Sequence, residues 1–386
     1  MNLNYTDEQR AFRQEVRDWM EANVPTERLP SFDLTREGFE AHRDWERKLN
    51  DGRWGMVTWP VELGGRGLDL IRWLIFEEEY YRAGAPTRVN QNGIFLLGPT
   101  MMEYGTEEQK ARFLPRMAAG DDIWAQAWSE PGAGSDLAGV RSTCTRAKND
   151  EWGDHYVLNG QKIWSTRAVY ADWAFGLFRE PGSERHKGMS LILFPLDAPG
   201  VTRRAIERMD GEKVFAEIFL DNVRVPVTDR LGDEGEGWKV CMATAGFERG
   251  LLLRSPARYQ QAVLKLIALY ERHKGELPAS MAERVARSWM DAEAYALAIY
   301  AMCSRLAAGG HIGPESSTNK IFWSELDMTL HQTALDILGS RAELMEGDPD
   351  RWLDGYIFAL AGPIYAGSNE IQRNIIAERM LGLPRN

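Results

Sequence analysis

A glycine-rich segment that begins with a tryptophan is the first stretch of this sequence that could bind a ligand. It reads Ala125-Gln126-Ala127-Trp128-Ser129-Glu130-Pro131-Gly132-Ala133-Gly134-Ser135-Asp136, the pattern of a strand end followed by a loop. Glycines in such a loop bare backbone N–H groups and let a flat or anionic ligand come close to the main chain. A glycine cluster alone is weak evidence, and a loop with a purely structural role is an equally good reading.

This segment resembles one of the two flavin-contacting segments of the acyl-CoA dehydrogenase family, and Ile163-Trp164-Ser165-Thr166 resembles the other. The stretches 105–110 and 379–385 are also similar to family segments and follow in the same order. The resemblance implies α,β-dehydrogenation of an acyl-CoA thioester to the 2-enoyl-CoA, in which a base removes the α-proton and a hydride passes from Cβ to flavin N5. It also implies that Ser135 contacts CoA and that FAD is bound by Trp128, Ser129, Trp164 and Thr166.

The C-terminal segment departs from the family at the residue that such a reaction needs most. The chain reads Tyr365-Ala366-Gly367-Ser368-Asn369-Glu370, where the family usually has a glutamate base between the tyrosine and the glycine. The α-proton of a thioester is too weakly acidic for water, so a carboxylate of raised pKa is required. Ala366 has none, but its backbone N–H can still hydrogen-bond the thioester carbonyl. The resemblance implies substrate contacts from Tyr365, Ala366 and Gly367, and flavin contacts from Ser368 and Glu370.

Glu248 is the carboxylate that we expect to replace the missing base. It directly precedes Arg249, and isovaleryl-CoA and long-chain acyl-CoA dehydrogenases, which this chain resembles, carry their base at the matching place. The apolar neighbours Phe247 and Leu251–Leu253 favour a raised carboxylate pKa, and Arg249 is then a substrate contact. The alternative is that Glu248 and Arg249 form an ordinary ion pair on a helix surface. Glu370 is a rival acid, one turn beyond the pocket.

Further departures affect the surface by which family members contact the FAD of a neighbouring subunit. Arg272 remains recognisable there, and Gln332 and Gly339 stand where a glutamine normally precedes a glycine-rich segment. This pattern resembles bacterial acyl-CoA dehydrogenases of steroid side-chain degradation, which are often α2β2 heterotetramers of two family members. We therefore expect either such a heterotetramer, acting on a bulky steroid acyl-CoA, or a homotetramer acting on branched or medium chains. The electron acceptor would be an electron-transferring flavoprotein or a similar protein.

Two other functions stay open. The chain could be a non-catalytic partner subunit that completes the flavin site of another chain, which Ala366 favours and Glu248 opposes. A flavin monooxygenase or nitroalkane oxidase on the same fold is the other, and the CoA-loop residue Ser135 argues against it.

The composition excludes several classes of protein. The 386 residues carry a formal net charge of −11 and no basic run, which argues against a nucleic-acid partner. Cys144, Cys241 and Cys303 are scattered, so we expect reduced thiols and no metal site. The N-terminus lacks the regions of a signal peptide, and no stretch approaches the ~20 apolar residues of a membrane span. We expect a cytoplasmic protein that does not enter a membrane.

Helices at both ends of the chain and strands in its middle must position these residues. Capping boxes at Thr6–Gln9 and Thr106–Gln109 predict helix starts. Long stretches with a helical pattern cover 280–306 and 318–338. Residues 155–164 read as a β-hairpin with an Asn159-Gly160 turn. The predicted fold is multidomain α+β, with a helical domain over 1–122, an antiparallel β-barrel or sandwich over 123–235 and a helical bundle over 236–386.

Overall fold

The computed structural model describes residues 4–149, 151–249, 255–310, 312–344 and 350–385, which divide into two compact units. The helical unit is drawn from residues 1–24, 68–85 and 249–386, and the sheet unit from 25–67 and 86–248. Helices occupy the N-terminal and C-terminal parts of the chain and strands its middle, so the predicted fold class is confirmed. The three domain boundaries given above stay a prediction.

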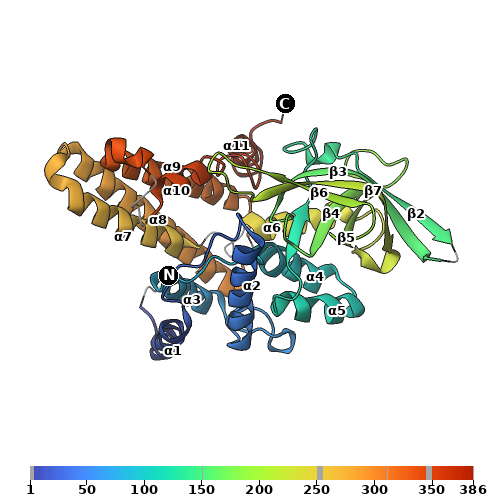
Figure 1. The fold of residues 1–386 in the computed structure, drawn as a ribbon, viewed down its shortest axis with the longest axis horizontal. Helices are drawn as coiled ribbons and strands as arrows, with labels where there is room; N and C mark the ends of the chain where they lie inside the picture. Colours follow the sequence, from blue (N-terminus) through green and yellow to red (C-terminus); the bar gives the residue numbers. More distant parts are fainter. Residues whose placement is uncertain (1–3, 150, 250–254, 311, 345–349, 386) are drawn as a thin grey trace. The chain divides into compact units, whose positions relative to one another are not determined.

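Two N-terminal helices and the C-terminal bundle make up the helical unit (Figure 1). Thr6 begins the first helix with the expected capping box, in which the Gln9 backbone N–H donates to the Thr6 hydroxyl over 3.2 Å. The long helices α7, α8 and α9 pack on one another, and α3 packs on both α7 and α8. The helices are α1 (Asp7–Asn23), α3 (Leu70–Arg82), α7 (Pro256–His273), α8 (Ser280–Ala307), α9 (Ser316–Leu338), α10 (Trp352–Ala359) and α11 (Asn369–Ile375).

A buried glutamate joins α1 to α3. The Glu79 side chain is 1% exposed and accepts hydrogen bonds from Arg13 over 3.1 Å and from Arg17 over 2.8 Å. Burial works to raise the pKa of Glu79, but the surrounding arginines outweigh it and hold that pKa below its usual range. α1 is therefore tied to the helical unit by charge as well as by its apolar face.

One mixed sheet of eight strands forms the core of the sheet unit, in the order β6-β7-β3-β2-β4-β5-β8, with β1 pairing in parallel with β4. Its buried face carries aliphatic and aromatic residues such as Leu158, Phe178 and Phe194. The strands are β1 (Trp124–Ala127), β2 (Thr143–Asn149), β3 (Gly153–Thr166), β4 (Trp173–Arg179), β5 (Met189–Pro195), β6 (Val201–Ile206), β7 (Phe215–Pro226) and β8 (Arg230–Leu231). The helices of this unit are α2 (Arg36–Asp51), α4 (Gly98–Tyr104), α5 (Glu107–Ala118) and α6 (Gly237–Arg249).

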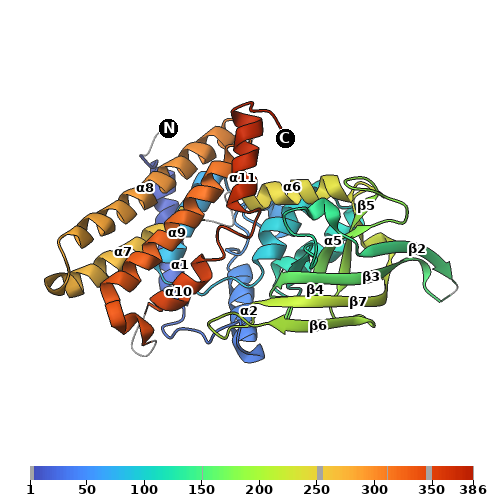
Figure 2. The same ribbon diagram turned by 90° about the horizontal axis from the view of Figure 1, so that it is seen from above.

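The predicted hairpin turn at Asn159-Gly160 is wrong. β3 runs through both residues without reversing, between β2 and β7 (Figure 2). The dipeptide instead marks a shift in the register with β7, and Gly160 has a φ of +140°. A Cβ at Gly160 would lie 2.2 Å from the Ser142 hydroxyl, so glycine is needed here for a close approach of two chains, and not for a turn.

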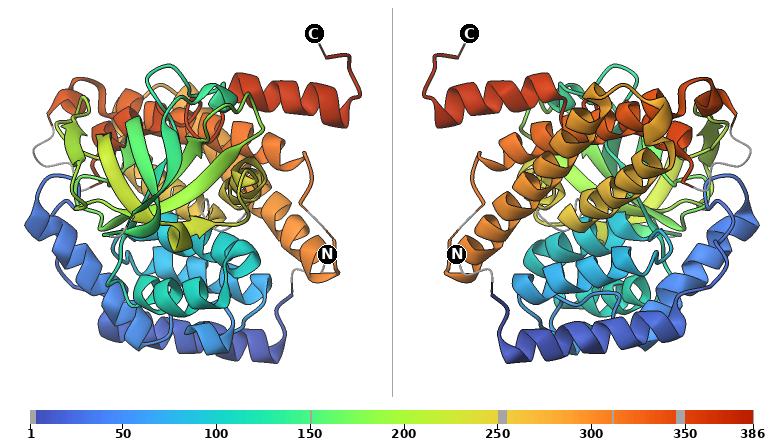
Figure 3. Two further views of the ribbon diagram at one scale, coloured as in Figure 1. Left: turned by 90° about the vertical axis from the view of Figure 1, so that its right-hand side faces the viewer. Right: turned by 90° about the vertical axis from the view of Figure 1, so that its left-hand side faces the viewer.

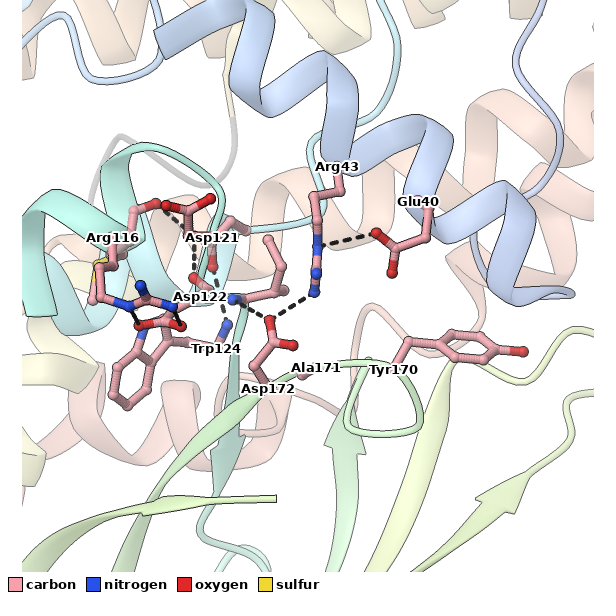
Figure 4. Close-up of polar contacts among 12 residues, drawn as sticks. Glu40, Arg43, Arg116, Asp121, Asp122, Trp124, Tyr170, Ala171 and Asp172 are labelled. Carbon is pink, nitrogen blue, oxygen red and sulfur yellow. Dashed lines mark hydrogen bonds and ion pairs between the residues drawn. The ribbon is translucent and has the colours of Figure 1, made fainter. Parts of the chain in front are cut away.

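Aspartate side chains fix the start of β1 and β4 against the helices of the sheet unit (Figure 4). Asp172, just before β4, accepts a hydrogen bond from the Arg43 guanidinium over 2.6 Å and another from the Ile123 backbone N–H over 2.8 Å. Arg116 of α5 binds the Asp122 carboxylate with two hydrogen bonds of 2.8 and 2.9 Å. Figure 3 shows α4 and α5 against the strands. The ring of Phe113 on α5 meets the stacked rings of Trp124 and Trp173 edge-on. These hydrogen bonds and ring contacts hold the start of β1 in place.

Candidate functional site

The two predicted flavin-contacting segments lie side by side in the sheet unit. The first follows the end of β1, and the second is the end of β3. They are joined by a hydrogen bond of 2.9 Å from the Ile163 backbone N–H to the Ser129 carbonyl oxygen. The structure thus brings Trp128 and Ser129 together with Trp164 and Thr166.

A buried ion pair locks these segments together. Lys162 is 0% exposed, and its ammonium donates to Glu130 Oε1 over 2.8 Å and to the Leu177 carbonyl over 2.5 Å. The Glu130 carboxylate also accepts the backbone N–H groups of Arg141 and Ser142, over 2.6 and 2.9 Å. Burial works to raise the pKa of Glu130, but the Lys162 charge and these donors outweigh it and lower that pKa, so the carboxylate stays ionised at neutral pH.

The two tryptophans differ in exposure. Trp164 is 56% exposed with a left-handed φ of +59°, and its ring meets Phe215 edge-on at 5.8 Å. Trp128 is buried against the edge of Phe175, and its indole N–H has no hydrogen-bond acceptor among the described residues. An exposed ring that the backbone holds in place offers a flat contact surface.

The glycine-rich loop after Trp128 is open to solvent. Glu130 and Ala133 exchange two backbone hydrogen bonds of 2.9 and 3.0 Å, which closes a tight turn. A Cβ added at Gly132 or at Gly134 would meet no atom within 4 Å, so packing within the chain does not require glycine at either position. Ser135, the predicted CoA contact, is exposed on the same loop.

The turn that contains Ala366 belongs to the helical unit. Ala366 and Gly367 both have a left-handed φ, of +56° and +76°, and the turn closes with a hydrogen bond of 2.8 Å from the Asn369 N–H to the Pro363 carbonyl. The Ala366 N–H has no acceptor within the described chain. The Tyr365 ring lies beside that of Trp323, with centroids 5.9 Å apart. This arrangement leaves an amide donor available at the position of the missing glutamate.

Glu370 follows this turn on α11 and is exposed. Its own backbone N–H and the Ser368 side chain lower the pKa of Glu370. A general base for a thioester α-proton needs the opposite shift, so the rival assignment of Glu370 as base loses support.

The structure places the backbone of Glu248 and Arg249 in the last turn of α6, but their side chains lie outside the described residues. The side chain of Phe247 and residues 250–254 also lie outside the described part of the chain.

The other predicted cofactor residues are spread over the helical unit. Arg272 of α7 lies 4.0 Å from the Asp350 carboxylate, and Gln332 of α9 donates to Asp336 over 3.0 Å. Gly339 ends α9 with a left-handed φ of +57° and with open space at its Cβ position. Among the described residues, these contacts join Arg272 and Gln332 to other side chains and not to the turn at Ala366.

The ion pair of Lys162 and Glu130 was not predicted. A usable signal existed, because strand alternation places Lys162 on the same face of β3 as Tyr156 and Leu158, and a lysine on a buried face requires an acid. Glu130 is the acid closest in sequence to Trp128, a predicted flavin contact.

Within the described residues, no group of histidine, cysteine or acidic side chains is arranged to hold a metal ion, and no helix is both long and apolar enough to cross a membrane. The three cysteines are buried as free thiols. Burial raises the pKa of Cys144 and of Cys303 to about 12, so neither thiol ionises near neutral pH.

Family models match the chain from end to end. Residues 6–121 match the acyl-CoA dehydrogenase N-terminal domain, residues 125–223 the middle domain, and residues 235–381 the C-terminal domain.

Known proteins resemble the whole chain as well. Acyl-CoA dehydrogenase IpdE1 of Mycobacterium tuberculosis (strain ATCC 25618 / H37Rv) is 40% identical over 382 residues, which cover 97% of each chain. Among solved structures, the Tcur3481–Tcur3483 steroid ACAD has a TM-score of 0.88 at 28% identity, and the ChsE4–ChsE5 complex from Mycobacterium tuberculosis has 0.82 at 32% identity. Both comparisons cover 100% of this chain and 100% of the other.

Proposed function

The chain belongs to the acyl-CoA dehydrogenase family, and from that premise we propose that it dehydrogenates a bulky acyl-CoA with Glu248 as the base. The family expected from the sequence is confirmed. Members of this family are FAD-dependent oxidoreductases, which also confirms the predicted class of enzyme and its cofactor.

The residues of the sheet unit fit a flavin. Trp164 presents an exposed ring, and the buried N–H of Trp128 has no acceptor among the residues that the structure describes. The glycine-rich loop has free space at Gly132 and Gly134. We assign FAD contacts there to Trp128, Ser129, Trp164 and Thr166. When bound, FAD supplies the acceptor for the hydride that leaves Cβ of the substrate.

The turn at Ala366 is the observation that carries the assignment of the base. Its Ala366 N–H has no acceptor in the part of the chain that the structure describes, and alanine has no carboxylate. The turn therefore supports polarisation of the thioester carbonyl but not proton abstraction. The base must then come from elsewhere, and the pKa of Glu370 is shifted in the wrong direction. Glu248 is the remaining acid that the family pattern places for this role.

The substitution Glu248→Gln tests this role. We expect the protein to fold and bind FAD as before, and the rate of flavin reduction by acyl-CoA to fall by about 10²–10⁴-fold, the usual contribution of a general base. The matched control is Glu283→Gln, because Glu283 is an exposed helical glutamate 3.7 Å from an arginine. Normal flavin reduction by the Glu248→Gln variant would refute the assignment.

The substrate and the assembly are part of the proposal. Two similar solved structures are a steroid ACAD of two named chains and a complex of two named chains, which supports a steroid side-chain acyl-CoA and an α2β2 heterotetramer. We assign this chain the role of the base-bearing subunit, and an electron-transferring flavoprotein or a similar protein the role of acceptor. The exposed Arg272 and the open end of α9 at Gly339 suit a surface that another chain completes.

The second candidate function is that of a non-catalytic partner subunit. It is favoured by the alanine at position 366, where the family usually has its glutamate base. The FAD content of the chain, purified alone and together with a second family member, separates the assemblies. We expect one FAD per two chains, and only in the mixed complex. One FAD per chain in the protein purified alone would rule out the obligate heterotetramer. A mixed complex in which Glu248→Gln has no effect would establish the non-catalytic role.

A further inference from the structure

Gln372, the fourth residue of α11, is hydrogen-bonded to the backbone of the turn at Ala366. Gln372 is 0% exposed, and its side-chain N–H₂ donates to the carbonyl oxygens of Ala366 and Gly367, over 3.1 and 3.2 Å. Because two carbonyl acceptors face this group, it must be the nitrogen side of the carboxamide. Gln372 Oε1 on the other side is buried and has no donor in the described chain. The turn thus uses the donors of Gln372 and leaves its acceptor unpaired.

A second buried group holds the start of α11. Asn369 Oδ1 accepts from Lys320 Nζ over 2.7 Å and from the Ser324 hydroxyl over 3.2 Å, both on α9. The three side chains are at most 3% exposed. Since the Asn369 backbone N–H closes the turn on Pro363, α9 fixes one end of the turn while Gln372 fixes its middle.

The conformation of the turn depends on these hydrogen bonds from Gln372. A left-handed φ is unfavourable for alanine, so the surroundings must impose the +56° of Ala366. A Cβ at Gly367 would lie 2.6 Å from Gln372 Nε2, which shows how closely the carboxamide approaches the main chain. The φ of Ala366 sets the direction of its own N–H, because that angle describes rotation about the N–Cα bond.

We propose that Gln372 is a positioning residue that aims the Ala366 N–H at the thioester carbonyl oxygen. This inference rests on the proposed function, in which that amide polarises the carbonyl. A donor for developing negative charge is effective only when it is already oriented, and Ala366 has no side chain that could help to orient it. The two hydrogen bonds from Gln372 supply that orientation.

The substitutions Gln372→Met and Gln109→Met form a matched pair. Gln109 is also buried, and its N–H₂ donates to two backbone carbonyls, those of Thr228 and Arg230, both over 2.7 Å. Both variants lose two hydrogen bonds to main-chain carbonyls, and Gln109→Met also loses the capping-box bond from the Thr106 N–H, so both should unfold at lower urea concentration. Only Gln372→Met should affect the chemistry.

The probes are oxidation of octanoyl-CoA, isovaleryl-CoA and a steroid side-chain CoA thioester, and the infrared carbonyl band of bound 2-octenoyl-CoA labelled with ¹³C at the thioester carbonyl. For Gln372→Met we expect kcat to fall about 10- to 100-fold with KM little changed, the size of effect expected for a misaimed donor. The carbonyl band should move toward its frequency in free 2-octenoyl-CoA. Gln109→Met should leave both unchanged.

Wild-type kcat and carbonyl frequency in Gln372→Met would overturn the positioning role while leaving the proposed function intact. Equal losses in both variants would also overturn it, because they would reflect stability alone. If the wild type, in complex with its partner where one is needed, oxidises none of the three thioesters, the proposed function fails and this inference with it. If Gln372→Met does not fold, Gln372→Ala, which removes the donors and fills no extra space, is judged by the same criteria.

Discussion

Replacement of Lys162 by methionine should weaken the buried link between the two predicted flavin-contacting segments. Methionine has a similar length but no charge, so the Glu130 carboxylate loses its partner 2.8 Å away and keeps only two backbone donors. Both side chains are nearly inaccessible, at 0% and 8% exposure, so solvent cannot compensate. Breaking a buried ion pair on one side costs about 3–5 kcal/mol, and we expect Lys162→Met to lose that much stability.

The assay is urea unfolding of the FAD-free protein, followed by tryptophan fluorescence and circular dichroism. The double variant Glu130→Gln/Lys162→Met should recover part of the loss, since it leaves no unpaired charge, and a coupling energy of about 1–3 kcal/mol is expected. A cost below about 1 kcal/mol for Lys162→Met, or additive single effects, would refute the idea that this pair holds the segments together.

The pH dependence gives a second check on the same pair. The pKa of Glu130 in the folded protein is below its ordinary value, so its contribution is present above the unfolded pKa of about 4.5 and is lost as the pH falls through the folded pKa. The stability difference between the wild type and Lys162→Met should therefore narrow as the pH falls below 7, because the unpaired Glu130 of the variant takes up a proton first. A difference that does not change with pH would mean that packing, and not charge, is responsible.

Two further predictions concern the sheet unit. Gly160→Ala should destabilise the protein by more than about 2 kcal/mol in urea unfolding, because Gly160 has a φ of +140° and Ser142 lies close to it. Gly132→Ala should change stability by less than about 0.5 kcal/mol, yet it should weaken FAD binding in a titration. Unchanged FAD affinity in Gly132→Ala would show that no ligand approaches this loop. Burial raises the pKa of Asp33 from 3.8 to about 6, so its ionisation costs about 3 kcal/mol above pH 6, and this cost disappears as the pH falls below about 4. Asp33→Asn should therefore be more stable by up to that amount at pH 7.5 and by much less at pH 4; an equal gain at both would contradict the assignment.

Local patterns predicted the helices well. The capping boxes at Thr6 and Thr106 begin α1 and α5, and the repeat over 280–306 matches α8, because these signals depend on neighbours within one or two turns. The prediction from Asn159-Gly160 was wrong because the conformation of this dipeptide depends on a residue distant in sequence, Ser142. The same two residues serve a hairpin turn or a register shift, and the position of Ser142 decides between them.

The candidate site shows the same division. Motifs singled out Trp128, Trp164 and the turn at Ala366 as candidates, since each motif is continuous in sequence. The side chains that hold those motifs were missed, because Lys162 meets Glu130 across 32 residues and the contacts of Gln372 depend on an unusual backbone conformation. The role of Glu248 remains a prediction, since its side chain lies outside the described residues.

The division of the chain into units has a consequence for its synthesis on the ribosome. The chain passes from one unit to the other at residues 24–25, 67–68, 85–86 and 248–249, so neither unit is a continuous stretch. α1 and α3 can pair early, but α7 and α8, on which α3 packs, emerge more than 170 residues later. The sheet unit ends at residue 248, before α7 and α8 are synthesised. It can therefore fold while the apolar faces of α1 and α3 are not yet covered by α7 and α8. A nascent chain of about 250 residues is therefore the form most in need of protection by a chaperone.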